Sequence, residues 1–348
     1  MQAGRITFAQ FMNEEQRTIE GATGDFTGLL NDVVTAAKVI ANEVGKGALI
    51  GTGKDLNTKM EALANEEMLH MGASSSHLAA LASEDMEGVT QIASDRQRGK
   101  YLLTFDPLNG SGNLDINFQS GTIFSVLRAP DAKRKPTEKD FLQPGSEIVC
   151  AGLVQYGAST RLIITTGLGV NGFTLDRGIG EFVLTHPKIT IPTAASTFAI
   201  NASNERFWEP PVRRYVQECM AGEGGPRGKT FGMRWVASLV AEAYRILTRG
   251  GVFLYPHDER TREQGGRLGL IYEANPIACI IEQAGGAAIT GRNRILDIKP
   301  DSLHQRAPFI FGSKDEVERL HRYHQEYIEG KDVDSYDMPL FSSRSLFR

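Results

Sequence analysis

Residues 101–125 read YLLTFDPLNGSGNLDINFQSGTIFS, and this stretch predicts a buried strand that stops at Asp106-Pro107 and is followed by a glycine-rich turn. Pro107 fixes its own φ and favours an extended conformation for Asp106, which places the Asp106 carboxylate at the C-terminal end of the strand. Gly110 and Gly112 let backbone N–H groups approach an anion closely. The stretch therefore predicts a site for a phosphate group beside an acidic side chain.

Three acidic residues, Glu84, Asp85 and Glu87, follow an apolar run at residues 78–82 that predicts a second strand. Carboxylates at two strand ends, beside a glycine turn, favour Mg²⁺ ions held against a phosphate, because this cation prefers oxygen ligands. An isolated Asp-Pro-Leu-Asn-Gly segment is also ordinary turn chemistry. Its position beside a second acidic strand end favours the metal and phosphate site.

The composition is that of an ordinary globular protein, because 41% of the 348 residues are hydrophobic and 23% are charged. The chain is long enough for one large domain or two. A net charge of −4 and a pI near 6.0 give no reason to expect nucleic acid or a membrane as a partner. No run of about 18 apolar residues and no signal-peptide pattern is present, so we expect a cytoplasmic protein.

The cysteines and histidines show no metal-ligand spacing. Cys150, Cys219 and Cys279 lie far apart without a Cys-x-x-Cys pair, which predicts buried free thiols. His321 and His324 share one helix face, and we expect both at the surface.

Helical and strand patterns alternate along the chain, and this order predicts an α/β layered fold with acidic residues at strand ends. The expected helices lie at residues 7–21, 25–44, 55–68, 235–247 and 275–284. The further expected strands lie at residues 123–127, 148–156, 161–170, 172–176, 181–185 and 268–273. A change of composition predicts two halves and a polar tail, at residues 1–192, 193–335 and 336–348.

Three segments resemble the class I fructose-1,6-bisphosphatases, members of the lithium-sensitive, Mg²⁺-dependent sugar-phosphate phosphatases. They are RGKYLLTFDPLNGSGNLDINFQSGTIFSVLRAP at 98–130, GGVFLYP at 250–256 and YEANPIACIIEQAGGAAITG at 272–291. The motifs occur in the family's order, and the resemblance extends from about Thr23 to about Gly312. It implies a layered α-β-α-β-α sandwich.

The resemblance also implies a site for two or more Mg²⁺ ions. Six positions match metal ligands of the family: Asp55, Glu84, Asp106, Leu108, Asn109 and Glu273. Leu108 matches a ligand that binds through its backbone carbonyl. Asp85 and Glu61 match the pair that activates the attacking water, with the Asp and Glu identities exchanged. Together with Asp106 they are the expected catalytic residues.

Sugar-phosphate and nucleotide sites follow from the same resemblance. The positions that match substrate contacts are Asn109, Gly110, Ser111, Gly112, Asn201, Asn204, Arg234, Tyr255 and Arg267. Arg234 matches an arginine that a neighbouring subunit donates, and the resemblance implies a homotetramer. The positions that match the pocket for the allosteric inhibitor AMP are Thr23, Gly24, Thr27, Lys100 and Tyr101.

The chain departs from the family pattern at several positions. Asn109 replaces an aspartate and Gly112 a serine, while Asn204 and Trp235 replace tyrosines, and the loop at 45–54 is short. These departures leave open a divergent paralogue that binds or processes another sugar phosphate. An inositol-type monophosphatase is disfavoured by the Lys-Tyr, FLYP and YEANP motifs.

The sequence favours hydrolysis of the 1-phosphate of fructose 1,6-bisphosphate, or also of sedoheptulose 1,7-bisphosphate, in gluconeogenesis or the Calvin cycle. Asn109 is expected to reduce that activity, because an amide removes one negative charge from a cation site.

Overall fold

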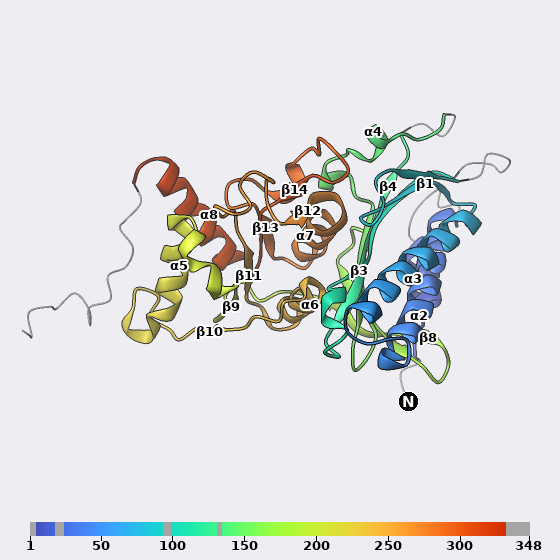
Figure 1. Ribbon diagram of the computed structural model, residues 1–348, viewed down its shortest axis with the longest axis horizontal. Coiled ribbons are helices and arrows are strands. Elements are labelled where there is room, and N and C mark those ends of the chain that lie inside the picture. The colour runs from blue at the N-terminus through green and yellow to red at the C-terminus, as the bar shows by residue number, and fades with distance from the viewer. Residues whose placement is uncertain (1–4, 18–23, 93–98, 131–133, 332–348) are drawn as a thin grey trace, which may run out of the picture.

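The computed structural model describes residues 5–17, 24–92, 99–130 and 134–331. Two large sheets and three sets of helices stack in five layers (Figure 1). Helices α2 (Asp25–Val44) and α3 (Gly53–Ser74) cover the outer face of the first sheet, and α6 (Leu239–Arg249) and α7 (Asn275–Gln283) fill the space between the sheets. Helices α5 (Pro210–Met220) and α8 (Lys314–Ile328) cover the second sheet. The predicted α-β-α-β-α sandwich is confirmed.

The first sheet has eight strands in the order β2-β1-β3-β4-β5-β6-β7-β8. Their bounds are β1 Leu78–Ser83, β2 Val89–Gln91, β3 Tyr101–Asn109, β4 Ser120–Arg128, β5 Cys150–Tyr156, β6 Arg161–Thr165, β7 Val170–Asp176 and β8 Glu181–Ile189. Two short helices accompany them, α1 Phe8–Arg17 and α4 Glu138–Phe141. Strands β1 and β3 are parallel neighbours, so their C-terminal ends meet at one edge of the sheet.

The second sheet has five strands in the order β10-β9-β11-β15-β13, and a separate pair joins β12 to β14. The bounds are β9 Thr197–Ala199, β10 Gly232–Met233, β11 Val252–Tyr255, β12 Leu268–Gly269, β13 Ala287–Ile289, β14 Arg306–Ala307 and β15 Phe309–Gly312. The outer helices are α5 Pro210–Met220 and α8 Lys314–Ile328. All strands of the eight-stranded sheet end before residue 190 and those of the second sheet begin after it. The division at 192 and 193 stays a prediction.

The expected helix faces form the core. In α2 the apolar positions at helical spacing are buried against the first sheet, as they are in α3 at Met60, Ala64 and Met68. Helices α6 and α7 bury apolar residues toward both sheets, which ties the two halves into one molecule. None of the described helices is both long enough and apolar enough to cross a membrane.

The central strand does not stop at Asp106-Pro107 as predicted. Strand β3 continues to Asn109, and its pairing with β4 is irregular between Asp106 and Asn109. This irregularity explains why Pro107 is tolerated, because a bulged position does not need a backbone N–H for the ladder. Gly110 then adopts the left-handed conformation that the turn requires, with φ 73°.

The prediction of a strand at residues 268–273 is largely wrong. Only Leu268–Gly269 is a strand, and residues 270–274 form a π-helical turn that leads into α7. A short apolar run does not distinguish a buried strand from a buried helical turn. The turn is stabilised locally, because the Gly269 N–H donates to Glu273 Oε2 at 2.6 Å.

Several further boundaries differ from the predictions, and two of them have a clear local cause. Helix α6 begins at Leu239 rather than at Trp235, because Ala237 has a φ of 56° and Ser238 caps the helix by accepting from the Ala241 N–H. The predicted strand 161–170 is a hairpin, whose turn contains two glycines with positive φ between β6 and β7.

Smaller predictions have mixed outcomes. All three cysteines are free, with Cys150 and Cys219 buried and Cys279 only partly so. The surface position expected for His324 is wrong, because its side chain is 1% exposed and its Nδ1 lies 2.8 Å from the Leu320 carbonyl oxygen. The end of the predicted helix 7–21 and the tail at 336–348 lie outside the described residues.

Candidate active site

Three carboxylates from separate elements meet where β1 and β3 end. Asp106 lies on β3, Glu84 directly follows β1, and Glu273 lies in the π-helical turn before α7. The parallel ladder continues one step past β1, because the Glu84 N–H donates to the Phe105 carbonyl at 3.0 Å. One oxygen from each carboxylate lies within 4.8 Å of the others, and no second such group of acidic, histidine and cysteine ligands exists among the described residues.

Burial and mutual repulsion oppose the joint ionisation of these groups. Burial raises the pKa of Glu84, and burial followed by the charge of Glu84 raises the pKa of Glu273 to about 8. The pKa of Asp106 rises well above its usual value, first through burial and then through the charges of Glu84 and Glu273. A divalent cation would remove this repulsion, so the cluster fits a metal with oxygen ligands.

Asn109 bridges two members of the cluster through its amide nitrogen. Nδ2 donates to Asp106 Oδ2 and to Glu273 Oε1, both at 2.8 Å. The nitrogen has to face the carboxylates, because the amide oxygen would add another acceptor among acceptors. To coordinate a cation through its oxygen, as the family resemblance implies, the Asn109 amide would have to rotate.

The expected catalytic pair lies beside the cluster. Asp85 occupies the turn after β1, and partial burial followed by the charges of Glu61 and Glu84 raises its pKa to about 6. Glu61, on α3, accepts a short hydrogen bond from Ser111 in the glycine turn. The exchanged Asp85 and Glu61 are therefore close enough to influence each other, and one of them contacts the turn.

A pocket of about 560 Å³ opens from the carboxylates. Its lining contains the expected site residues Glu84, Asn109, Gly110, Asn201, Tyr255, Arg267 and Glu273. We call Glu84, Asp106, Asn109 and Glu273 the carboxylate end. Asn201, Asn204, Trp235 and Tyr255 form the distal end. One pocket thus joins the predicted metal residues to the predicted sugar-phosphate residues.

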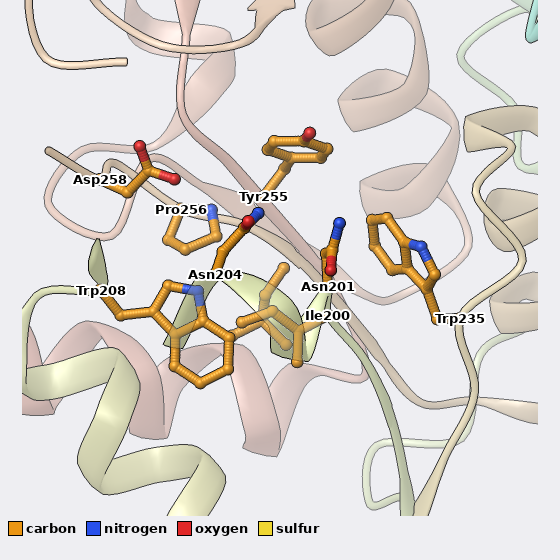
Figure 2. A pocket seen from close by; sticks show the side chains of 9 residues that line it. Ile200, Asn201, Asn204, Trp208, Trp235, Tyr255, Pro256 and Asp258 are labelled. Carbon is orange, nitrogen blue, oxygen red and sulfur yellow. The ribbon is translucent and has the colours of Figure 1, made fainter. Parts of the chain in front are cut away.

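The four residues of the distal end are neutral, and the acidic Asp258 lines the small cavity beside them. Figure 2 shows Asn201, Asn204 and Tyr255 between Trp208 and Trp235, around a small cavity of about 10 Å³. Trp235 stacks on Phe253 with 5.8 Å between ring centroids and an angle of 7°. The Asn201 side-chain oxygen accepts from the Ser203 N–H at 3.1 Å, which fixes its orientation.

Several expected residues lie elsewhere. Asp55 is exposed at the start of α3, where it pairs with Lys59 at 2.7 Å, and it is not part of the carboxylate group. Arg234 is exposed and does not line the pocket of its own chain. Gly112 is exposed in the turn with open space around it, and Leu108 is buried, its N–H donating to Asp106 Oδ1 at 3.1 Å.

The expected nucleotide residues gather at the N-terminus of α2. Gly24 precedes the helix with a φ of 80°, and Thr27 donates its hydroxyl to Gln16 at 2.9 Å. Lys100 pairs with Asp25 at 2.7 Å, and Tyr101 begins β3 beside them, its ring against Phe26. Thr23 lies outside the described residues.

Sequence reasoning missed two parts of the pocket. Arg306, at the start of β14, lines it, and the preceding motifs gave no reason to select this exposed arginine. The N-terminus of α6, at residues 237–239, also lines it. Ser238 in a capping position was the signal that could have located this helix start.

A buried carboxylate cluster that opens onto a pocket with two arginines and a helix N-terminus has the features of a metal-assisted phosphatase. The family model of the fructose-1-6-bisphosphatase N-terminal domain matches residues 6–187, and that of the C-terminal domain matches residues 191–325. The chain belongs to the fructose-1,6-bisphosphatase family.

Individual relatives agree with this assignment. A protein of Hydrogenophilus thermoluteolus named fructose-1,6-bisphosphatase class 1 is 50% identical, and the match covers 98% of this chain and 97% of the relative. The holo crystal structure of Leishmania major fructose-1,6-bisphosphatase is similar with a TM-score of 0.85 and 36% identity, covering 92% of this chain and 99% of that one. The apo form gives a TM-score of 0.84 and 35% identity, with 92% and 100% covered.

Membership of this family implies a divalent metal cofactor. The carboxylate oxygens of Glu84, Asp106 and Glu273 are suitable ligands for such a cation. The cation would also neutralise the repulsion between these three negative charges.

Proposed function

We propose that this chain hydrolyses the 1-phosphate ester of fructose 1,6-bisphosphate, releasing inorganic phosphate and fructose 6-phosphate. One observation carries the proposal: a single pocket is lined by the carboxylates Glu84 and Glu273 and by Asn201, Tyr255 and Arg267, which match distal phosphate contacts. The name of the relative with 50% identity supports the same substrate. Sedoheptulose 1,7-bisphosphate has the same two-phosphate chemistry and is a candidate second substrate.

The residues of the carboxylate end would hold two or more Mg²⁺ ions. Glu84, Asp106 and Glu273 supply carboxylate oxygens, and the Leu108 carbonyl and the Asn109 amide oxygen are the proposed neutral ligands. When bound, the ions polarise the phosphoryl oxygens and stabilise the leaving alkoxide. The protein's remaining task is to position the substrate and the water.

Asp85 is the proposed acceptor of the proton from the attacking water. Its pKa, raised to about 6, suits a base that works near neutral pH. Glu61 raises that pKa and also binds Ser111, so it couples the base to the glycine turn. The water oxygen forms the new bond to phosphorus, the bond between phosphorus and the oxygen of carbon 1 breaks, and that oxygen takes up a proton from solvent to become a hydroxyl.

The phosphoryl group would lie between the glycine turn and α6. Backbone N–H groups of Gly110, Ser111 and Gly112 and the N-terminus of α6 favour an anion there. A Cβ placed on Gly110 would lie 3.4 Å from Ser238 Oγ, so the turn and the helix start are close neighbours.

We also propose a cytoplasmic homotetramer that AMP inhibits. The grouping of Gly24, Thr27, Lys100 and Tyr101 at the N-terminus of α2 supports an AMP phosphate site. The exposure of Arg234, together with its absence from the lining of its own pocket, supports its donation to a neighbouring subunit.

Phosphate release from fructose 1,6-bisphosphate tests the proposal. We expect Mg²⁺-dependent release that a chelator abolishes, and a higher rate for Asn109→Asp, because an added carboxylate improves neutralisation of the cations. Asn293→Asp makes the same change at an exposed loop and should leave the rate unchanged. Sedoheptulose 1,7-bisphosphate is assayed in parallel.

Two outcomes would contradict the proposal. Release by Asn109→Asp alone would identify a relative that keeps the binding site but has lost hydrolysis. No release by either protein would mean that the pocket serves another phosphorylated sugar.

A further inference from the structure

Two arginines supply the positive charge of the pocket lining. Among the described residues that line it, only Arg267 and Arg306 are cationic side chains. A bisphosphate carries two anionic groups, and the carboxylate end is itself strongly anionic. A phosphate that approaches this end therefore needs a cation provided by the protein or by bound metal.

The side chain of Arg306 starts close to two of the three carboxylates. In the β12–β14 pair it lies opposite Gly269. A Cβ added at Gly269 would lie 3.4 Å from Glu273 Oε2 and 3.8 Å from Glu84 Oε1. Directly opposed residues in an antiparallel pair have Cβ positions about 4.5–5.5 Å apart. Because position 269 has no side chain, the space over these carboxylates is open to the arginine across the pair.

The guanidinium of Arg306 is held at the pocket rim. Nη1 donates to the Arg267 carbonyl oxygen at 2.6 Å, and the side chain is otherwise exposed. Its positive charge lies next to the carboxylate end, because Arg306 lines the same pocket as Glu84 and Glu273 and is paired with Gly269 beside them. A guanidinium has five N–H donors in a planar fork that suits a phosphate, and the tether uses only one of its two ends.

We propose that Arg306 binds the phosphoryl group that is hydrolysed, at the carboxylate end of the pocket, while Arg267 serves the distal phosphate. This assignment rests on the proposed function, because it takes the substrate to be a bisphosphate whose two phosphates lie at opposite ends. Arg306 holds this phosphate against the metal ligands, and its charge offsets the repulsion from Glu84 and Glu273.

Binding measurements with two separate probes test whether each arginine binds a different phosphate. Inorganic phosphate represents the transferred group, and fructose 6-phosphate carries only the distal one. With Mg²⁺ fixed, Arg306→Ala should weaken the binding of inorganic phosphate about tenfold or more, as expected for a charge-assisted hydrogen bond. It should leave the affinity for fructose 6-phosphate within about twofold. Arg267→Ala should show the opposite pattern.

Kinetics and a rescue variant separate binding from structural damage. Arg306→Ala should lower kcat/KM about a hundredfold and Arg306→Lys less, because lysine keeps the charge but not the fork. Gly269 has an extended conformation, with φ −63° and ψ 127°, that any residue adopts. The pair Arg306→Ala with Gly269→Arg returns a guanidinium from the opposite strand, and it should recover at least tenfold in phosphate affinity. Arg249→Ala, at the exposed end of α6, is the matched control.

The affinity for Mg²⁺ provides an independent test. Removing a cation next to metal carboxylates should leave Mg²⁺ binding equal or tighter, so lost activity cannot come from lost metal. Unchanged phosphate affinity in Arg306→Ala, or equal weakening of both probes, would overturn the proposal, as would weaker Mg²⁺ binding. Because inorganic phosphate binding needs no turnover, it decides the role of Arg306 even if fructose 1,6-bisphosphate is not hydrolysed.

Discussion

The two ends of the pocket are stabilised in opposite ways. The carboxylate end gathers Asp106, Glu84 and Glu273 from different elements, and their burial makes each more difficult to ionise. The distal end packs Trp235 against Phe253 and contains neutral amides that bind their own turns. The first arrangement costs free energy until a cation enters, whereas the second is complete by itself.

This difference indicates where chemistry and recognition are located. Ionisable groups with strongly shifted pKa values are common at reacting centres. A site that stabilises charge in the transition state has to contain charges that are unpaired before the substrate or metal binds. Preformed neutral surfaces provide shape and hydrogen bonds for recognition. Substitutions at the carboxylate end should therefore change rate strongly and can raise the stability of the metal-free protein, while those at the distal end should change affinity modestly.

Asp106→Asn should produce the largest effect. The amide keeps the shape but removes a buried negative charge from the carboxylate end, so kcat should fall by about a thousandfold or more. The metal-free protein should at the same time melt at a higher temperature, because one member of a repelling group becomes neutral. Phosphate release and thermal melting in a chelator measure the two effects.

The exposed Asp297→Asn is the control for this change, and it should alter neither quantity by much. A variant at Asp106 that lost stability in the metal-free state would show that the carboxylates are not in conflict, and the contrast between the two ends would fail.

The stability of the metal-free protein should fall as pH rises through about 8. Glu273 has its pKa raised from 4.5 to about 8 by folding, so the folded protein binds a proton that the unfolded chain has already released. Its contribution is fully present below about pH 4.5 and is lost by about pH 8, with an expected size of a few kcal/mol. Chemical denaturation at a series of pH values measures this slope.

Glu273→Gln provides the reference for that experiment. This variant should show a flatter dependence of the unfolding free energy on pH between pH 5 and 8. His186 and His324 have lowered pKa values, which make stability rise with pH. Both proteins contain these histidines, so their contribution is removed when one curve is subtracted from the other. Saturating Mg²⁺ should also flatten the slope in the unaltered chain. Equal slopes in both proteins without metal would contradict the raised pKa of Glu273.

The same contrast explains how much the sequence could predict. Asp106 and Glu84 were located from strand ends and a glycine turn, because parallel neighbours bring their C-terminal ends together. The element that carries Glu273 was predicted wrongly as a strand, since a short apolar run is equally typical of a buried helical turn. Its proposed role as a metal ligand nevertheless followed from the family motif, which depends on position in the sequence rather than on local conformation.

Arg306 could not be found in this way, because its place in the pocket depends on the β12–β14 pairing, which has no local sequence signal. The start of α6 had one signal, Ser238 in a capping position, but the left-handed Ala237 before it had none. The orientation of Asn109 was also beyond sequence, because the direction of an amide is set by the acceptors around it.

The smallest predicted effect concerns Trp235 at the distal end. Trp235→Tyr adds a phenolic hydroxyl, and Trp235→Phe provides a ring of the same size without it. We expect Trp235→Tyr to bind fructose 6-phosphate about threefold to tenfold more tightly than Trp235→Phe does, through one hydrogen bond to the phosphate. Both should lose about 1–2 kcal/mol of unfolding free energy, because a smaller ring leaves part of the contact with Phe253 unfilled.

The value of kcat decides what this last comparison means. If the distal end serves recognition alone, kcat should change less than about threefold in both variants while the affinity for fructose 6-phosphate moves. A fall in kcat as large as that expected for Asp106→Asn would place Trp235 in the chemistry. The separation into a reacting end with the proposed metal ligands and a distal end that serves recognition would then be wrong, because a side chain that stacks on Phe253 would be controlling the transition state.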